Sequence, residues 1–133
     1  MRAVYKDVRK TAYAHDNGAT FENPFYVRYE QPYTMTVVVH VLNGKIIKLG
    51  ALREYQGAMP NGIRVGMVLV DAMEIEPRIY FDEFDEQLYI KQIPGITFER
   101  PDPRDRDSRI EAISVFLPDL KDNWDSEKGT GNW

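Results

Sequence analysis

The sequence predicts an all-β protein: a single antiparallel sandwich or barrel with an N-terminal arm or short helix and an extended C-terminal tail. Short runs rich in Val, Ile, Thr, Tyr and Phe, which favour strands, recur between positions 25 and 117. Proline, glycine and Asn-Gly separate these runs, as turns do in antiparallel folds. We therefore predict an arm at residues 1–20, a β-domain at 21–117 and a tail at 118–133.

The composition fits one globular domain and excludes several chemistries. A chain of 133 residues is long enough to bury a core of its own. The absence of cysteine excludes disulfides, thiolate catalysis and cysteine-ligated metal centres. A net charge of −4 gives no basic field to attract nucleic acid. No apolar run approaches the ~20 residues of a membrane span, and the N-terminus lacks a signal core. We expect a soluble protein made in the cytoplasm, with no nucleic-acid or membrane partner.

The first 14 residues differ from the rest. Met1, Val4, Tyr5, Val8 and Ala12 recur at helical spacing. Four basic residues against one aspartate give this segment a charge of about +3. So short a helix is marginal alone in water. Three interpretations remain open: a terminal helix packed on the domain, an arm that docks on a neighbouring subunit, or a helix on a membrane surface.

The first predicted strands follow Phe21. Residues 25–30 and 33–42 are rich in Tyr, Val and Thr, and Pro24 and Pro32 lie at their edges, where strands tolerate proline.

Asn43-Gly44 predicts a hairpin, because Asn-Gly accepts the positive φ angles of a two-residue type I′ turn. Both faces of this hairpin would carry apolar residues, as expected for strands covered on two sides by a second sheet or another subunit. The predicted pairs are Val41 with Ile46, His40 with Ile47, Val39 with Lys48 and Val38 with Leu49.

The second half continues the series of strands. Residues 51–56 can extend the preceding strand after a bulge at Gly50, and Met59-Pro60-Asn61-Gly62 reads as a turn. The remaining predicted elements are strands at 67–76 (ended by Pro77), 78–81, 87–92, 96–100 and 109–117, a turn at Ile93-Pro94-Gly95, and a polar loop at 101–108.

No residue pattern supports an enzyme. His40 lies within a strand among apolar neighbours and reads as a hydrogen-bonded histidine of the core or of an interface. His15 precedes Asp16 without a nucleophile, and Gly-x-Ser-x-Gly is absent. The glycine-rich phosphate motifs are absent too. We therefore predict no catalytic residue, no metal ligand and no cofactor.

The most acidic stretch is residues 71–86, where seven carboxylates against one arginine give a local charge near −6. It can be the solvated edge of a hairpin, a docking surface for a basic partner, or a metal or catalytic site. The spacing of an EF-hand loop is absent. The predicted docking residues are Asp82, Glu83, Asp85 and Glu86.

Two further groups have competing interpretations. The arginines of the loop at 101–108 and its flanks can touch phosphates, but the interleaved aspartates favour a rigid, salt-bridged, solvated loop. An aromatic group can stack on sugars or bases, although in a strand-rich domain such rings more often belong to the core. The group comprises Phe21, Phe25, Tyr26, Tyr29 and Tyr33.

The tail holds both tryptophans, Trp124 and Trp133. Exposed tryptophan is costly, and tryptophan is enriched among interface anchors. With the basic Arg2, Arg9 and Lys10, the chain has two candidate arms of unlike character. The acidic stretch is a candidate acceptor for the basic arm, in a head-to-tail contact of the sort that closes rings.

These features predict a non-enzymatic, β-rich structural or adaptor protein that self-assembles or docks through its terminal arms, as a homo-oligomer or with other protein subunits. Components of virus or phage particles, such as head, connector or tail accessory subunits, share this plan, so incorporation into a virion is one expectation. The alternative is a small acidic inhibitor or immunity-type protein that binds a basic target through residues 71–86. A carbohydrate-binding module is the third candidate.

Overall fold

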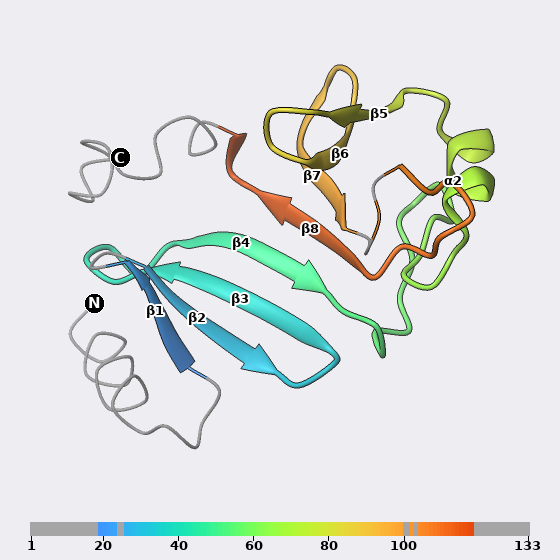
Figure 1. Ribbon diagram of the computed structural model, residues 1–133. Helices are drawn as coiled ribbons and strands as arrows, with labels where there is room; N and C mark the ends of the chain where they lie inside the picture. Colours follow the sequence, from blue (N-terminus) through green and yellow to red (C-terminus); the bar gives the residue numbers. More distant parts are fainter. Residues whose placement is uncertain (1–18, 24–25, 100–101, 103, 119–133) are drawn as a thin grey trace. The chain divides into compact units, whose positions relative to one another are not determined.

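The computed structural model describes residues 19–23, 26–99, 102 and 104–118 (Figure 1). Contacts divide the chain into two compact units. The first unit comprises the chain up to Leu49 together with the chain from Phe116 onward, and the second unit spans Gly50–Val115. In the described residues the regular structure is antiparallel strand with one short helix, and the strands do not close into a barrel. The predicted fold class is confirmed, and an open barrel or a sandwich fits it. The predicted arms lie outside the described residues, apart from the few that border the strands.

The first unit is a meander of neighbouring antiparallel strands, in the order β1-β2-β3-β4. Tyr33 takes a positive φ of 61° in the turn between the second and third strands. The strands are β1 (Ala19–Asn23), β2 (Tyr26–Gln31), β3 (Met35–His40) and β4 (Ile46–Ala51), the last two residues of which belong to the second unit.

Both faces of β3 are buried. Val38 and Val39 are adjacent in the strand, so their side chains point to opposite faces, and both are buried. On the face of Val38, the ring of Tyr26 meets His40 edge-on, with 5.3 Å between ring centroids. The prediction that both faces of the hairpin are covered thus holds for β3 but not for β4, where Ile46 and Leu49 are exposed.

The hairpin between β3 and β4 forms, but the predicted register is wrong. The amide of His40 donates to the carbonyl of Lys45 (2.9 Å), which leaves a loop of residues 41–44 instead of a two-residue turn. Gly44 has a positive φ of 71°, but Asn43 does not have the positive φ that a type I′ turn needs. The Asn43 side chain instead accepts a hydrogen bond from the amide of Lys45 (3.0 Å), which stabilises the longer loop.

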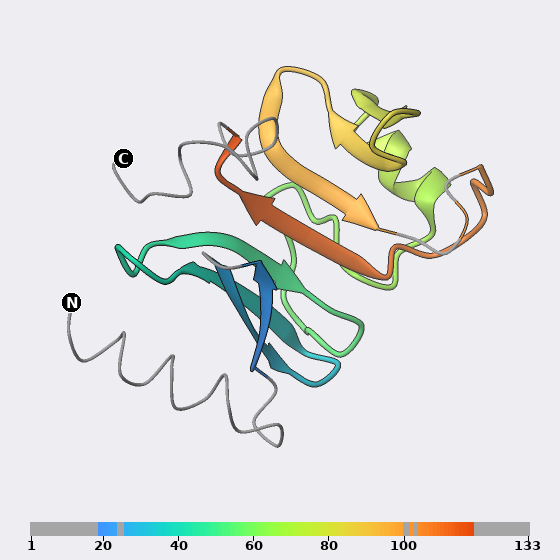
Figure 2. The same ribbon diagram turned by 60° about the vertical axis from the view of Figure 1, so that its left-hand side comes forward.

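The second unit contains a short helix and a second antiparallel meander, in the order β8-β7-β6-β5, so β5 is an outer strand (Figure 2). The elements are α2 (Leu69–Ile75), β5 (Ile79–Asp82), β6 (Gln87–Ile90), β7 (Ile93–Glu99) and β8 (Ala112–Phe116).

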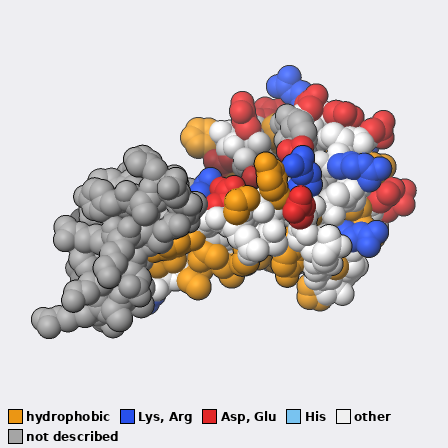
Figure 3. Space-filling view, turned by 90° about the horizontal axis from the view of Figure 1, so that it is seen from below, with side chains coloured by type: hydrophobic (Ala, Val, Ile, Leu, Met, Phe, Trp, Pro, Cys, Tyr) orange, Lys and Arg blue, Asp and Glu red, His pale blue; other side chains and the backbone are white. Residues whose placement is uncertain are grey.

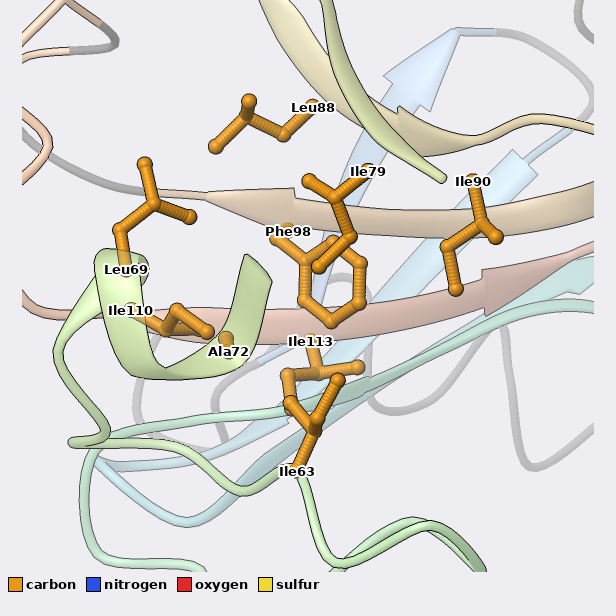
Figure 4. Packing of buried hydrophobic residues seen from close by; sticks show 9 residues of the cluster. All are labelled: Ile63, Leu69, Ala72, Ile79, Leu88, Ile90, Phe98, Ile110 and Ile113. Carbon is orange, nitrogen blue, oxygen red and sulfur yellow. The ribbon is translucent and has the colours of Figure 1, made fainter. Parts of the chain in front are cut away.

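One apolar cluster forms the core of this unit, and the ring of Phe98 lies in the middle of it (Figure 4). The helix contributes Leu69 and Ala72, and the irregular segment before it contributes Ile63. Every strand of the unit also contributes at least one side chain. The cluster comprises Ile63, Leu69, Ala72, Ile79, Leu88, Ile90, Phe98, Ile110 and Ile113.

Residues 67–76 were predicted as a strand, and the structure corrects this to helix α2. Leu69 and Ala72, three positions apart, are both buried, which is the spacing of one helix face. Residues 72–76 (Ala-Met-Glu-Ile-Glu) also include strong helix formers. Pro77 ends the element, as expected.

Two further predictions in this region are wrong. Strand β4 stops at Ala51 and does not continue through residues 52–56. Pro94 and Gly95 lie inside β7 instead of forming a turn; the turn is at Lys91 and Gln92, where Gln92 has a φ of 65°. The β6–β7 register is irregular beside Pro94, and such a bulge accommodates a residue without an N–H.

The core position of Phe98 gives a stability prediction. Replacing it by alanine (F98A) removes a buried ring and leaves a cavity, so we expect a loss of about 3–5 kcal/mol in the free energy of unfolding. The same change at the exposed Phe84 (F84A) is the matched control, with an expected effect within about 0.5 kcal/mol. Urea unfolding followed by circular dichroism measures both. Equal effects would contradict the assignment of Phe98 to the core.

Candidate functional site

The predicted acidic docking residues gather at the turn of the β5–β6 hairpin. Asp82 ends β5 and pairs with Gln87, the first residue of β6. The strands predicted on each side of the acidic tip are therefore confirmed, the first shifted by one residue to 79–82 and the second shortened from 87–92 to 87–90. We call residues 82–86 the hairpin tip; they are Asp82, Glu83, Phe84, Asp85 and Glu86.

Two of the four tip carboxylates hold the turn in shape. Asp82 Oδ1 accepts hydrogen bonds from the amides of Phe84 (3.0 Å) and Asp85 (3.2 Å). Asp85 Oδ2 accepts a hydrogen bond from the Tyr89 hydroxyl on β6 (2.9 Å). Glu86 closes the turn with a positive φ of 54°. The tip is thus fixed by local bonds within its own hairpin.

Phe84 is the residue that the sequence reasoning missed. Its side chain is 95% exposed, the largest exposure among the large apolar residues of the described chain. The signal was present in the sequence, because a phenylalanine between four acidic residues cannot easily join an apolar core. The arrangement presents an aromatic ring to solvent with the exposed carboxylates of Glu83 and Glu86 beside it.

The other carboxylates of residues 71–86 do not join the tip. Asp71 and Glu74 are exposed on α2, and Glu76 is buried in an ion pair with Arg78. Two guanidinium hydrogen bonds of 2.8 Å link that pair. No group of three or more potential metal-ligating side chains occurs among the described residues. The acidic stretch is therefore divided between a helix, an ion pair and a hairpin.

Arg78 sets the charge state of Glu76. Its guanidinium hydrogen bonds hold the pKa of the Glu76 carboxyl below the ordinary value, against an opposing effect of burial, and its backbone amide and positive charge act in the same downward direction. The pair follows the end of α2 and immediately precedes β5. Glu76 therefore stays ionised at neutral pH and helps to fix the chain between the helix and the hairpin.

His40 and the aromatic group belong largely to the framework. His40 is fully buried, and its Nδ1 accepts a hydrogen bond from the amide of Asn43 (3.4 Å), so its predicted place in the core is confirmed. Tyr26 is also fully buried. Tyr29 lies three residues further along β2 and so points to the opposite face. These two rings form no common stacking platform; the side chains of Phe21 and Phe25 lie outside the description.

Aspartates hold the polar loop before β8 through its backbone. Asp102 Oδ1 accepts from the amide of Arg104 (2.8 Å), and Asp105 Oδ1 accepts from the amide of Asp107 (3.0 Å). Arg109 donates to the carbonyl of Gly66 (2.8 Å). These hydrogen bonds to the backbone hold the part of the loop that the structure describes.

The predicted arm residues Arg2, Arg9, Lys10, Trp124 and Trp133 lie outside the described residues, as does His15. No helix in the described part of the chain is long and apolar enough to cross a membrane. Comparison with known proteins found no matching family model, no similar curated protein and no similar solved structure. The function has to be argued from the surfaces of this chain.

The Glu76–Arg78 pair gives a pH prediction. Because the folded-state pKa of Glu76 lies below its unfolded-state value, the pair stabilises the fold above the ordinary glutamate pKa of about 4.3. That contribution disappears as the pH falls through the lower folded-state pKa. We expect Glu76→Gln to reduce the loss of stability between about pH 7 and about pH 3. Glu74→Gln, on an exposed helix position, is the control. Unfolding midpoints in urea at both pH values would show identical shifts for the two variants if the pair had no such role.

Proposed function

We propose that this chain is a non-enzymatic, β-rich structural or adaptor protein that works by binding other protein chains. The observation that carries the proposal is the exposure of large aliphatic side chains at the loop end of the β3–β4 hairpin. Leu42 in the loop is 47% exposed, and Ile46, the first residue of β4, is 52% exposed. Figure 3 shows hydrophobic side chains at the described surface as well as charged ones.

This exposure occurs on an ordered part of the chain. The next residue along β4, Ile47, is buried, and its carbonyl accepts a hydrogen bond from the amide of Leu117 (3.0 Å). The strand is therefore held in place while its neighbouring aliphatic side chain remains in water. Apolar area left in water costs about 25 cal/mol per Å². A protein partner that covers Leu42 and Ile46 would recover part of that free energy.

The terminal arms are part of the same proposal. Residues 1–20 and 118–133 supply the basic segment and the two tryptophans, which are chemically suited to docking on neighbouring subunits. A small β-domain with two such arms has the plan of a head, connector or tail accessory subunit of a virus or phage particle. We propose that kind of assembly because the arrangement of a small β-domain with two arms is analogous.

The acidic hairpin favours a second candidate, a small acidic inhibitor or immunity-type protein. The specific observation is that Phe84 and its flanking carboxylates project from a fixed turn. Such a protein would be a monomer until it met its basic target. Concentration-dependent self-association separates the two candidates.

Light scattering over a concentration series tests the assembly proposal. We expect the full chain to form an oligomer. We expect the double variant Leu42→Ser/Ile46→Ser to associate at least about tenfold more weakly, which corresponds to about 1.4 kcal/mol. Ile75→Ser, at a 44% exposed position on α2, is the control that should leave association unchanged.

Removal of residues 1–14 and 119–133 tests the arms in the same assay, and we expect it to yield monomers. A full chain that stays monomeric at every concentration would refute assembly through copies of itself and would favour the inhibitor candidate.

A further inference from the structure

The hairpin tip has the properties of a docking anchor. Phe84 is 95% exposed at the end of a two-stranded projection whose base is packed into the core through Ile79, Leu88 and Ile90. Interface hot spots are commonly large side chains of this kind that enter an apolar surface on the partner. A ring so placed is accessible to a surface outside its own hairpin.

The negative charge of the tip indicates that a complementary partner surface is basic. Glu83 and Glu86 are exposed, and neither makes a hydrogen bond or ion pair with another residue that the structure describes. Asp82 and Asp85 add two further carboxylates while they hold the turn. The complementary surface is therefore apolar at its centre and basic around it, because like charges brought together would oppose binding.

The tip is prepared for binding by its own bonds. The two amide hydrogen bonds to Asp82 and the Tyr89–Asp85 bond fix the backbone from which Phe84 projects. A partner consequently does not have to order the loop, and less of the interaction free energy is lost on association.

This chain itself contains a segment with the required chemistry. Residues 1–14 carry a charge of about +3, and the same segment holds Val4, Tyr5 and Val8. We propose that the hairpin tip of one copy docks on residues 1–14 of a second copy, with Phe84 against the apolar side chains and the tip carboxylates against the cations. This inference rests on the proposed assembly function and names the contact within it.

Such a contact is head-to-tail, because the two surfaces that meet are different parts of the chain. Each copy can then offer its tip to one neighbour and its basic segment to another. Repetition closes a ring if the rotation between copies permits and otherwise continues as a filament. Since the contact joins groups of opposite charge, it should weaken as salt is raised.

A charge-exchange experiment tests the pairing in the full-length protein. In one variant Glu83→Lys and Glu86→Lys offset the two remaining aspartates, so the tip loses its net negative charge. In the other, the segment is made acidic by Arg9→Glu and Lys10→Glu. The first variant alone loses the attraction between tip and segment, and the second alone brings like charges together, so we expect at least about tenfold weaker association of each by light scattering. In an equimolar mixture the unaltered tip of the second variant meets the unaltered segment of the first, so we expect the mixture to associate into pairs of unlike copies.

The anchor is tested separately. Phe84→Ser should weaken association of the full chain at least about tenfold, since the ring fills the centre of the contact. Tyr55→Ser, which removes another exposed ring (44%) from the same unit, should not. Circular dichroism and urea unfolding establish that each variant is folded, so a loss of association cannot be ascribed to a loss of structure.

The outcomes separate this inference from the proposed function. If the full chain assembles and both charge variants also assemble alone, the tip contact is wrong while assembly stands. If the variants fail alone and their mixture also fails, the tip binds its own chain or a different protein, and the second-copy contact is overturned. If the full chain is monomeric throughout, the proposed assembly fails and this contact fails with it.

Discussion

Burial of the apolar cluster around Phe98 is the constraint on which the second unit depends. The cluster joins two irregular segments, a helix and four strands, none of which has enough apolar area to be stable alone. It also explains why the acidic hairpin is ordered. Leu88 and Ile90 occupy one face of β6 and enter the core, so the base of the hairpin is fixed and only its end projects into solvent.

The opposite face of these strands is organised by polar contacts. Thr97 on β7 donates from its hydroxyl to Gln87 on β6 (3.1 Å), and Ser114 on β8 donates to Glu99 on β7 (3.3 Å). A register slip of one residue would exchange this face with the apolar one. The polar rows and the core thus specify the same register, and that register places Asp82 where it can close the turn.

The sequence was sufficient for the fold class, for the burial of His40 and for the acidic hairpin, because these follow from local periodicity and turn chemistry. It misled where two local signals compete. Asn43 was predicted to form a two-residue turn by adopting a positive φ, whereas its side chain accepts a hydrogen bond from the amide of Lys45 in a longer loop. Residues 67–76 begin with the apolar run Met-Val-Leu-Val, which suits a strand, but a helix buries Leu69 and Ala72 on one side. Four acidic neighbours signalled the exposure of Phe84, whereas the exposure of Leu42 and Ile46 depends on tertiary packing, which no short window of sequence contains.

The closure of the hairpin tip by Asp82 and Asp85 has a consequence for how this surface can change. The bonds that shape the turn come from the first and fourth positions of the tip, and their partners are backbone amides and Tyr89. The side chains at positions 83 and 84 contribute nothing to that shape. Substitutions there change the exposed side chains without removing a bond that shapes the turn, so under the proposed contact the choice of partner and the folding of the hairpin depend on different residues. The residues at positions 83 and 84 can therefore vary while the hairpin keeps its shape.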